Sequence, residues 1–348
     1  MLLTQSPRSR RSLLSSSIAV LLSSVILAGC STVDSGGAAT DSQPAGNTAY
    51  TTPRTMPSGK GSDESDGVFP RTVKHFEGST RLEAAPKRVV VISTGQADAL
   101  LTLGVVPVAS TAGDAADLVP SYLADAFPDR ASALADVRSI GNRFAPDVET
   151  IAAVQPDLIL MNTAGKDADT LYSSLAKIAP TVATRGTGRY WKQDFLLLAD
   201  ALGKTQQAET WLTTYQEDAR TFGEGVQGNP TVSFLRYNSD RLRVFGVASF
   251  PGSVAEDAGL VRPVAQDFTN GTSQDISSEQ LALADSDFVY AGVQGGDTKK
   301  LTSLALWPTL EAVGRKRVTF IDDDVFYLNT GPTAARRVLA ELGRTAGL

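Results

Sequence analysis

The residue types that most often carry catalysis or bind metals are scarce in this chain. Its 348 residues include one Cys, Cys30, and one His, His75. A lone Cys forms no internal disulfide and no cluster of thiolate ligands, and a lone His excludes a zinc site built on two histidines. Serine-hydrolase chemistry would depend on His75 alone, and the sequence has no Gly-x-Ser-x-Gly motif. The sequence therefore favours a binding protein over an enzyme, with no metal site and no cofactor.

Two further patterns could be mistaken for binding sites. The run Asp322–Asp324 lacks the spaced Glu and the loop pattern of a calcium-binding EF-hand, so we expect a solvated turn. Gly223, Gly225 and Gly228 neither follow a strand nor open a helix, so they do not predict a phosphate-binding loop. The net charge of −6 argues against nucleic acid as a partner.

Cys30 ends a stretch with the organisation of a bacterial signal peptide. Arg8, Arg10 and Arg11 precede an apolar stretch, residues 13–27, that is too short and too rich in Ser to span a membrane. Leu-Ala-Gly before Cys30 resembles the lipobox of bacterial lipoproteins, in which the Cys becomes the diacylated first residue. A plain secretory signal with an incidental Cys is the alternative, and the paired arginines leave both Sec and twin-arginine export open.

We therefore predict a signal peptide over residues 1–29 and a lipid anchor on Cys30. The anchor would hold the protein in the bilayer, on the extracytoplasmic face of the cell membrane. Residues 31–67 are rich in Ser, Thr, Gly, Asp and Pro and have almost no large apolar side chains. Such a segment cannot bury enough surface to offset the entropy cost of ordering it. Residues 30–67 are thus expected to form a lipidated, flexible tether.

The rest of the chain alternates between buried strands and helices. Residues 88–92 form a continuous apolar run, which is typical of a strand buried on both faces of a parallel sheet. Helical spacing follows over residues 97–103 and stops at Gly104. Residues 204–222 contain neither Gly nor Pro and predict a long helix that follows a break at 203–205.

Three sequence blocks occur twice, in the same order. The pairs are 103–109 with 258–265, 149–160 with 279–290, and 175–182 with 310–321. Each copy of the second block predicts a short helix, a turn at an Asp and a buried strand. Three blocks in one order indicate two α/β lobes of similar topology. The expected divisions are an N-terminal lobe over 68–188, an inter-lobe helical segment over 189–227 and a C-terminal lobe over 228–348.

These residues resemble the substrate-binding proteins of ferric-siderophore ABC importers, a family that also includes vitamin B12 and haem receptors. The resemblance runs over essentially all of 71–348. It rests on Pro-Lys-Arg-Val-Val at 86–90, Leu-Gly-Val at 103–105, the Glu149 block with Pro-Asp-Leu-Ile at 156–159, and Leu-Gly-Lys at 202–204. It implies two Rossmann-like α/β lobes joined by one long α-helix, with the ligand cleft between the lobes. It also implies a receptor that hands a ferric siderophore to the subunits of an ABC permease.

The resemblance directs attention to the loops at the carboxyl ends of the strands, where α/β sheets bind ligands. A ferric siderophore needs Arg for its anionic or oxygen-rich groups and aromatic side chains for its flat chelate faces. Eight residues at such positions are predicted to bind the ligand: Gln96, Arg143, Arg189, Tyr190, Trp191, Arg236, Tyr237 and Phe326.

Structural roles are the alternatives for these residues. Ser93 or Thr94 could cap the helix beside Gln96, Arg143 could be a surface residue, and the Tyr-Trp pair could pack beneath the inter-lobe helix. Either Phe326 or Tyr327 could belong to the core. Arg262 is a weaker candidate, whereas Arg241 and Arg243 are expected to be solvated.

Glu149 and Glu279 occupy the same position in the two copies of the second repeat, each expected in the first turn of a helix. An acid at this place stabilises the helix dipole, which would explain each Glu separately. The family implies a second role, because its receptors use one Glu per lobe to meet Arg pockets on the permease. We therefore predict that Glu149 and Glu279 dock the permease.

Other functions remain open at this point. Within the family, the ligand could be haem or cobalamin. From other classes, the chain could be an extracellular lipoprotein hydrolase, which the missing motif and single His disfavour, or a docking lipoprotein without a role in transport.

Overall fold

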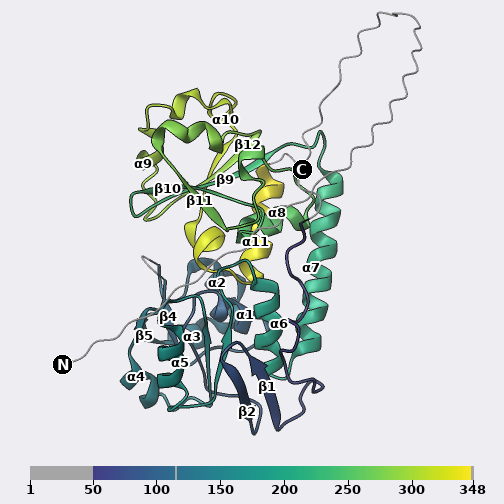
Figure 1. Cartoon of the computed structure of the whole chain (residues 1–348), viewed down its shortest axis with the longest axis vertical. Coiled ribbons are helices and arrows are strands. Elements are labelled where there is room, and N and C mark those ends of the chain that lie inside the picture. Colours follow the sequence, from purple (N-terminus) through teal and green to yellow (C-terminus); the bar gives the residue numbers. More distant parts are fainter. Residues whose placement is uncertain (1–49, 114–115, 346–348) are drawn as a thin grey trace, which may run out of the picture. The chain divides into compact units, whose positions relative to one another are not determined.

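The computed structural model describes residues 50–113 and 116–345 (Figure 1). The predicted signal peptide, Cys30 and the first part of the predicted tether lie outside the described residues. Within them, no helix is long and apolar enough to cross a membrane. The strands of two large sheets alternate with helices along the chain, which confirms the predicted α/β class.

The sheet of the N-terminal lobe has six strands in the order β6-β5-β4-β3-β7-β8. Strand β3 is parallel to both neighbours and consists of three fully buried valines, as expected for a strand covered on both faces. The strands are β3 (Val89–Val91), β4 (Ala109–Ala112), β5 (Arg138–Asn142), β6 (Ala145–Pro146), β7 (Leu158–Asn162) and β8 (Thr181–Thr184). The helices are α1 (Gln96–Thr102), α2 (Ser121–Ala126), α3 (Ala131–Ala135), α4 (Val148–Ala153) and α5 (Ala168–Leu175).

The sheet of the C-terminal lobe has five strands in the order β11-β10-β9-β12-β13. Its strands are β9 (Val232–Asn238), β10 (Arg241–Phe245), β11 (Ser273–Ile276), β12 (Phe288–Val293) and β13 (Val318–Ile321). Its helices are α8 (Phe250–Asp257), α9 (Lys299–Thr302) and α10 (Glu311–Gly314).

The repeat detected in the sequence corresponds to equivalent elements in the two sheets. β3, β7 and β8 run parallel side by side, and so do β9, β12 and β13. Gly104 and Gly259 both follow a helix with left-handed φ values of 77° and 67°. The lobes differ after the first strand, because β9 turns at Ser239 and Asp240 directly into antiparallel β10, whereas β3 leads through α1 to parallel β4.

Two helices occupy the predicted inter-lobe segment, α6 (Trp191–Ala201) and α7 (Thr205–Gly225). The predicted break between them is present, with Gly203 at a φ of 69°. Before the N-terminal sheet, β1 (Arg71–His75) and β2 (Gly78–Leu82) form an antiparallel hairpin. His75 is buried within it, 2.9 Å from the Thr80 hydroxyl. Burial and Lys60 lower the pKa of His75 to about 4, so this side chain is neutral at pH 7.

The C-terminal helix α11 (Pro332–Thr345) packs against α1 of the N-terminal lobe and α8 of the C-terminal lobe. Asp98 of α1 binds the start of α11 at this contact. Its fully buried carboxylate accepts the backbone N–H groups of Thr333 (2.8 Å) and Ala334 (2.9 Å) in the first turn of α11. The hydroxyl of Tyr122 donates to the same carboxylate at 2.9 Å.

We expect Asp98→Ala to lower the free energy of unfolding by about 2–4 kcal/mol, since it removes a helix cap and leaves buried donors without an acceptor. Chemical denaturation followed by circular dichroism measures this change. Asp98→Asn keeps one acceptor oxygen and should lose less. Asp125→Ala, an exposed change on α2, is the control and should unfold as the wild type does. Equal stability of Asp98→Ala and the control would show that the hydrogen bonds of the Asp98 carboxylate do not stabilise the fold.

Residues 50–67, here called the strap, lie against the folded body and correct the predicted tether. The Thr52 amide donates to Glu256 of α8 at 3.3 Å, and the Ser62 hydroxyl donates to Asp200 of α6 at 2.7 Å. Thr52 is fully buried. Figure 1 shows the strap in purple beside α7. The prediction of a free tether is therefore wrong for residues 50–67. Hydrogen bonds, an ion pair between Arg54 and Glu256, and Met56, which packs against the hydrophobic core, hold this segment on the body.

Candidate functional site: a cavity lined by both lobes

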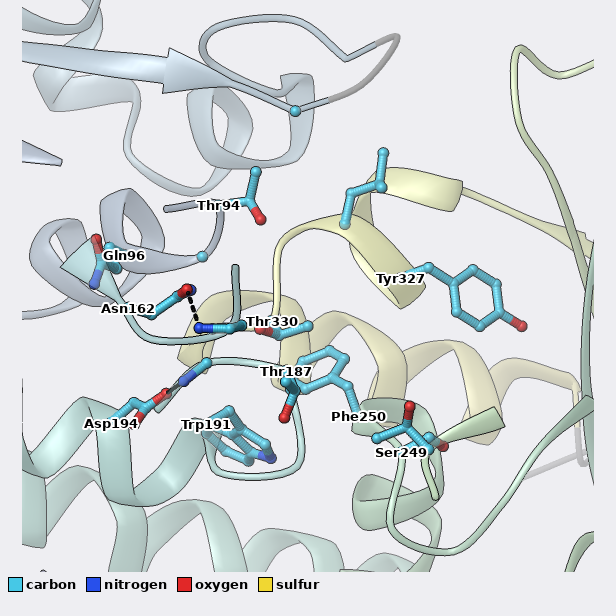
Figure 2. A pocket seen from close by; sticks show the side chains of 18 of the residues that line it. Thr94, Gln96, Asn162, Thr187, Trp191, Asp194, Ser249, Phe250, Tyr327 and Thr330 are labelled. Carbon is cyan, nitrogen blue, oxygen red and sulfur yellow. Dashed lines mark hydrogen bonds between the residues drawn. The ribbon is translucent and has the colours of Figure 1, made fainter. Parts of the chain in front are cut away.

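A cavity of about 370 Å³ lies at the carboxyl ends of strands from both sheets (Figure 2). The N-terminal lobe contributes residues at the carboxyl ends of β3, β4, β5, β7 and β8, and the inter-lobe segment contributes part of α6. The C-terminal lobe contributes β9, β10, the start of α8 and residues 326–332. This is the place where ligands bind to open α/β sheets.

Arg236 and Arg243 form a cross-strand pair on the cavity wall. They lie opposite each other in the antiparallel register of β9 and β10. The buried Arg236 guanidinium binds the Asp323 carboxylate through two nitrogens, with Nε 2.7 Å from Oδ1. Arg243 donates to the Asn238 side chain, while its Nε has no hydrogen-bond partner among the described residues. Burial first, and then the charge of Arg236, lower the pKa of Arg243. Facing like charges destabilise a sheet, so the pair is suited to an anionic ligand.

Arg143 is the third cation of the cavity. Its guanidinium carbon lies 4.3 Å from the ring centre of exposed Phe144. The described lining includes three Arg, one Asp and no Lys or Glu. The Asp is Asp194, which accepts the backbone N–H groups of Arg185 (3.0 Å) and Gly186 (2.7 Å). Burial raises the pKa of Asp194 to about 7, so this carboxyl is only partly ionised at pH 7.

Aromatic rings form the apolar part of the lining. Trp191 is buried with its indole N–H donating to Ser253 at 2.9 Å, and it packs edge-on against Phe250 with ring centres 5.7 Å apart. Tyr327 donates its hydroxyl to the carbonyl of Leu235 at 3.1 Å, and burial raises its pKa. The polar ends of both rings are thus occupied, which leaves their apolar parts to line the cavity.

Five of the eight predicted ligand-binding residues line this cavity: Gln96, Arg143, Trp191, Arg236 and Phe326. Gln96 is buried, and its amide is committed to the fold. The side chain donates to the carbonyl of Met161 at 2.8 Å and accepts the backbone N–H of Ser93 at 3.2 Å. A ligand contact through this amide therefore stays a prediction, and it would have to share the amide with these bonds. Neither Ser93 nor Thr94 caps α1, whose N-cap is Gly95.

The other three predicted residues do not line the cavity. Arg189 donates to the carbonyl of Thr269, and its Nε lies 3.4 Å from the hydroxyl of Tyr50 at the start of the strap. Tyr190 lies under the guanidinium of Arg185, 4.3 Å from ring centre to guanidinium carbon. Both side chains are therefore engaged outside the cavity, Arg189 by Tyr50 and Thr269 and Tyr190 by Arg185.

Tyr237 is excluded by the geometry of its strand. Successive side chains of a strand point to opposite faces, so Arg236 and Tyr237 cannot both face the cavity. The Tyr237 hydroxyl lies 3.4 Å from Asp240 instead. Conversely, Arg243 was expected to be solvated and is half-buried in the lining. Arg262 is buried away from this lining, where it donates to the carbonyl of Phe245.

Several lining residues were missed by the sequence analysis. Most of them are small polar residues near the end of a strand or the start of a helix. This position in the sequence pattern could have identified them as candidates for the lining. They include Asn162, Thr187, Ser249, Phe250 and Thr330, all labelled in Figure 2.

The two predicted docking acids occupy equivalent, exposed positions. Glu149 lies in the first turn of α4, where Asp147 accepts its backbone N–H. Glu279 lies in the first turn of a 3₁₀ helix (Ser278–Ala284) that begins with a capping box at Ser277. Hydrogen bonding from Ser277 lowers the pKa of Glu279. The structure thus confirms the predicted helix starts, and it shows each Glu accessible to a partner.

Within the described part of the chain, no group of three or more His, Cys, Asp or Glu side chains could hold a metal ion.

The two sheets and their shared cavity define a two-lobed binding protein. The chain belongs to the periplasmic binding protein family, whose family model matches residues 89–325. This confirms the predicted fold and family.

Named relatives belong to the same group. The chain is 30% identical over 292 residues to the probable siderophore-binding lipoprotein YfiY of Bacillus subtilis. The matched region covers 78% of this chain and 86% of that protein. It is 25% identical to the Fe(3+)-citrate-binding protein YfmC of the same organism, over 81% and 89% of the two chains. The solved structure of Staphylococcus aureus SirA complexed with staphyloferrin B has the same fold, with a TM-score of 0.67, 24% identity and coverage of 79% and 97%.

Proposed function

We propose that this protein is a membrane-anchored extracytoplasmic receptor that binds an anionic ferric siderophore and delivers it to an ABC permease for iron uptake. The observation that carries the proposal is the Arg236–Arg243 pair, together with Arg143, beside aromatic faces in one cavity. Guanidinium groups bind carboxylate and other oxygen anions by paired hydrogen bonds, and aromatic faces suit flat chelates. The names of the relatives support the same ligand class.

Quenching of the intrinsic Trp fluorescence, to which Trp191 in the cavity wall contributes with Trp211 and Trp307, tests the proposal. The protein is titrated with ferric citrate, with ferric catecholate, hydroxamate and phenolate-oxazoline siderophores, and with haem and cobalamin. We expect saturable quenching by an anionic ferric siderophore, with weaker binding at high salt. Saturation only by haem or cobalamin would select the alternative ligands. No binding by any of these compounds would favour a docking lipoprotein without a transport role.

The lipid anchor has its own test. Cys30 is the sole Cys and ends the Leu-Ala-Gly box, so acylation is expected there. Cys30→Ala should move the protein from the membrane fraction to the soluble extracytoplasmic fraction, because one apolar anchor is lost. Fractionation and immunoblotting measure this, with Cys30→Ala compared with an unaltered chain expressed at the same level. A variant that stays wholly with membranes would contradict the lipoprotein assignment.

Delivery to the permease is assigned to Glu149 and Glu279. Their matching positions in the two lobes and their exposure support this role. Surface charges of this kind steer association and set its register more than they add affinity.

A further inference from the structure

The loop after β8 holds three consecutive residues in the left-handed region. Gly186, Thr187 and Gly188 have φ values of 79°, 72° and 70°. Glycine adopts this conformation without steric cost, whereas a β-branched residue there is a conformational outlier. The middle residue of this turn is therefore strained, and its neighbours are not.

The surrounding structure fixes the backbone of this loop from both sides. Asp194 accepts the amide of Gly186 at 2.7 Å. A Cβ on Gly186 would lie 2.6 Å from the Asn162 side chain, and a Cβ on Gly188 would lie 2.9 Å from that of Thr330. Glycine is thus required at both flanking positions for space as well as for conformation. The left-handed φ of Thr187 follows from these constraints.

Nothing in the packing accounts for a Thr at position 187. The residue is exposed, and it lines the cavity, as Figure 2 shows. Among the described residues, its hydroxyl has no hydrogen-bond partner and contributes to no cap. Glycine would serve the fold better here, so the side chain is kept at a cost in stability. Backbone strain that packing imposes on an exposed residue is characteristic of ligand-binding sites.

We propose that Thr187 is a specificity-determining residue whose hydroxyl hydrogen-bonds an oxygen atom of the ligand. This inference rests on the proposed function for the ligand class, an oxygen-rich ferric siderophore. The constrained backbone fixes the position of the Thr187 Cβ on the wall, so little backbone freedom is lost when the ligand binds. A siderophore that offers no acceptor at this place would bind less well.

Three variants test the inference. Thr187→Val keeps the β-branched shape and the strain but removes the hydroxyl. Its affinity for the ferric siderophore should fall roughly two- to tenfold, the effect of one hydrogen bond, with an unchanged melting temperature. Thr187→Gly should weaken binding similarly and raise the melting temperature of the ligand-free protein by about 2–4 °C, because it relieves the strain. Thr187→Ser keeps a hydroxyl and should retain most of the affinity.

Each result bears on a different step. Wild-type affinity in Thr187→Val would overturn the ligand contact. A melting temperature of Thr187→Gly at or below that of the wild type would overturn the strain on which the inference depends, and this measurement needs no ligand. Failure of the wild-type protein to bind any of the ferric siderophores would instead overturn the proposed function.

Discussion

We expect the replacement of Arg236 with Ala to weaken binding of an anionic ferric siderophore by roughly ten- to a hundredfold. One charge-assisted hydrogen bond contributes about 1.5–3 kcal/mol, and this change of affinity corresponds to that range. The guanidinium is buried in the cavity wall and is oriented by Asp323, so it is positioned before the ligand arrives. A positioned cation loses little entropy on binding, which places the effect toward the upper end of the range.

The loss of Arg236 also leaves the Asp323 carboxylate unpaired, and this effect must be distinguished from the loss of the contact with the ligand. Asp323 would be left without its cation beside the cavity, and its negative charge would repel an anion. The double variant Arg236→Ala with Asp323→Ala removes this repulsion and should recover part of the affinity. Arg243→Ala, which leaves no carboxylate unpaired, should also weaken binding and reduce its dependence on salt.

Arg241→Ala is the matched control, because Arg241 lies on the same strand as Arg243 but forms an exposed ion pair with Asp275 outside the cavity. Its affinity should equal that of the wild type. All variants are checked by their thermal unfolding before titration. If Arg236→Ala and Arg243→Ala, both folded, bind as tightly as Arg241→Ala, the cavity arginines do not hold the ligand.

Local sequence patterns predicted the sheets well because a strand buried on both faces consists mainly of apolar residues. The valines of β3 could be recognised as a doubly covered strand, and the repeated blocks predicted two lobes of similar topology, in which β7 pairs with β3 and β12 with β9. Gly104 and Gly259 marked equivalent helix ends, since each needs a left-handed residue. These features depend on neighbours in the sequence or on a single buried face.

The site was less predictable because its residues depend on pairing between distant or reversed segments. Arg243 faces the cavity only because β10 returns antiparallel from β9 and brings it opposite Arg236. That hairpin has no counterpart in the N-terminal lobe, so the repeat could not suggest it. Strand alternation, by contrast, could have excluded Tyr237 once Arg236 was placed in the wall.

The strap was missed for a related reason. Its composition includes few large apolar side chains, and that composition predicts disorder when ordering must be offset by apolar burial. Here the ordering is offset by hydrogen bonds to the body, together with the packing of Met56 against the hydrophobic core. One example is the guanidinium of Arg71, which is fully buried and donates to the carbonyls of Ser65 and Val68. Composition alone does not reveal such bonds, because their partners lie on other elements.

The second large effect is expected on transport rather than on binding. The double change Glu149→Ala and Glu279→Ala should abolish siderophore-dependent iron uptake while the affinity of the purified protein for its ligand stays at the wild-type level. Both acids lie outside the cavity lining and are exposed, so neither change disturbs the ligand site. Loss of a first-turn acid costs each helix only about 0.3–1 kcal/mol, too little to unfold the protein.

Two comparisons distinguish docking from helix stabilisation. The conservative double change to Gln keeps the size of both side chains but removes their charge, so uptake should still be lost if charge docks the permease. Asp147→Asn changes another acid beside the start of α4, in one lobe only, and should leave most of the uptake. Transport of radioactive ferric siderophore is measured in cells that contain little receptor, so that docking limits the rate. Each single Glu variant should retain partial uptake, because one lobe would still engage the permease and set the register. Wild-type uptake by the double Gln variant at low receptor level would show that these acids serve only their own helices.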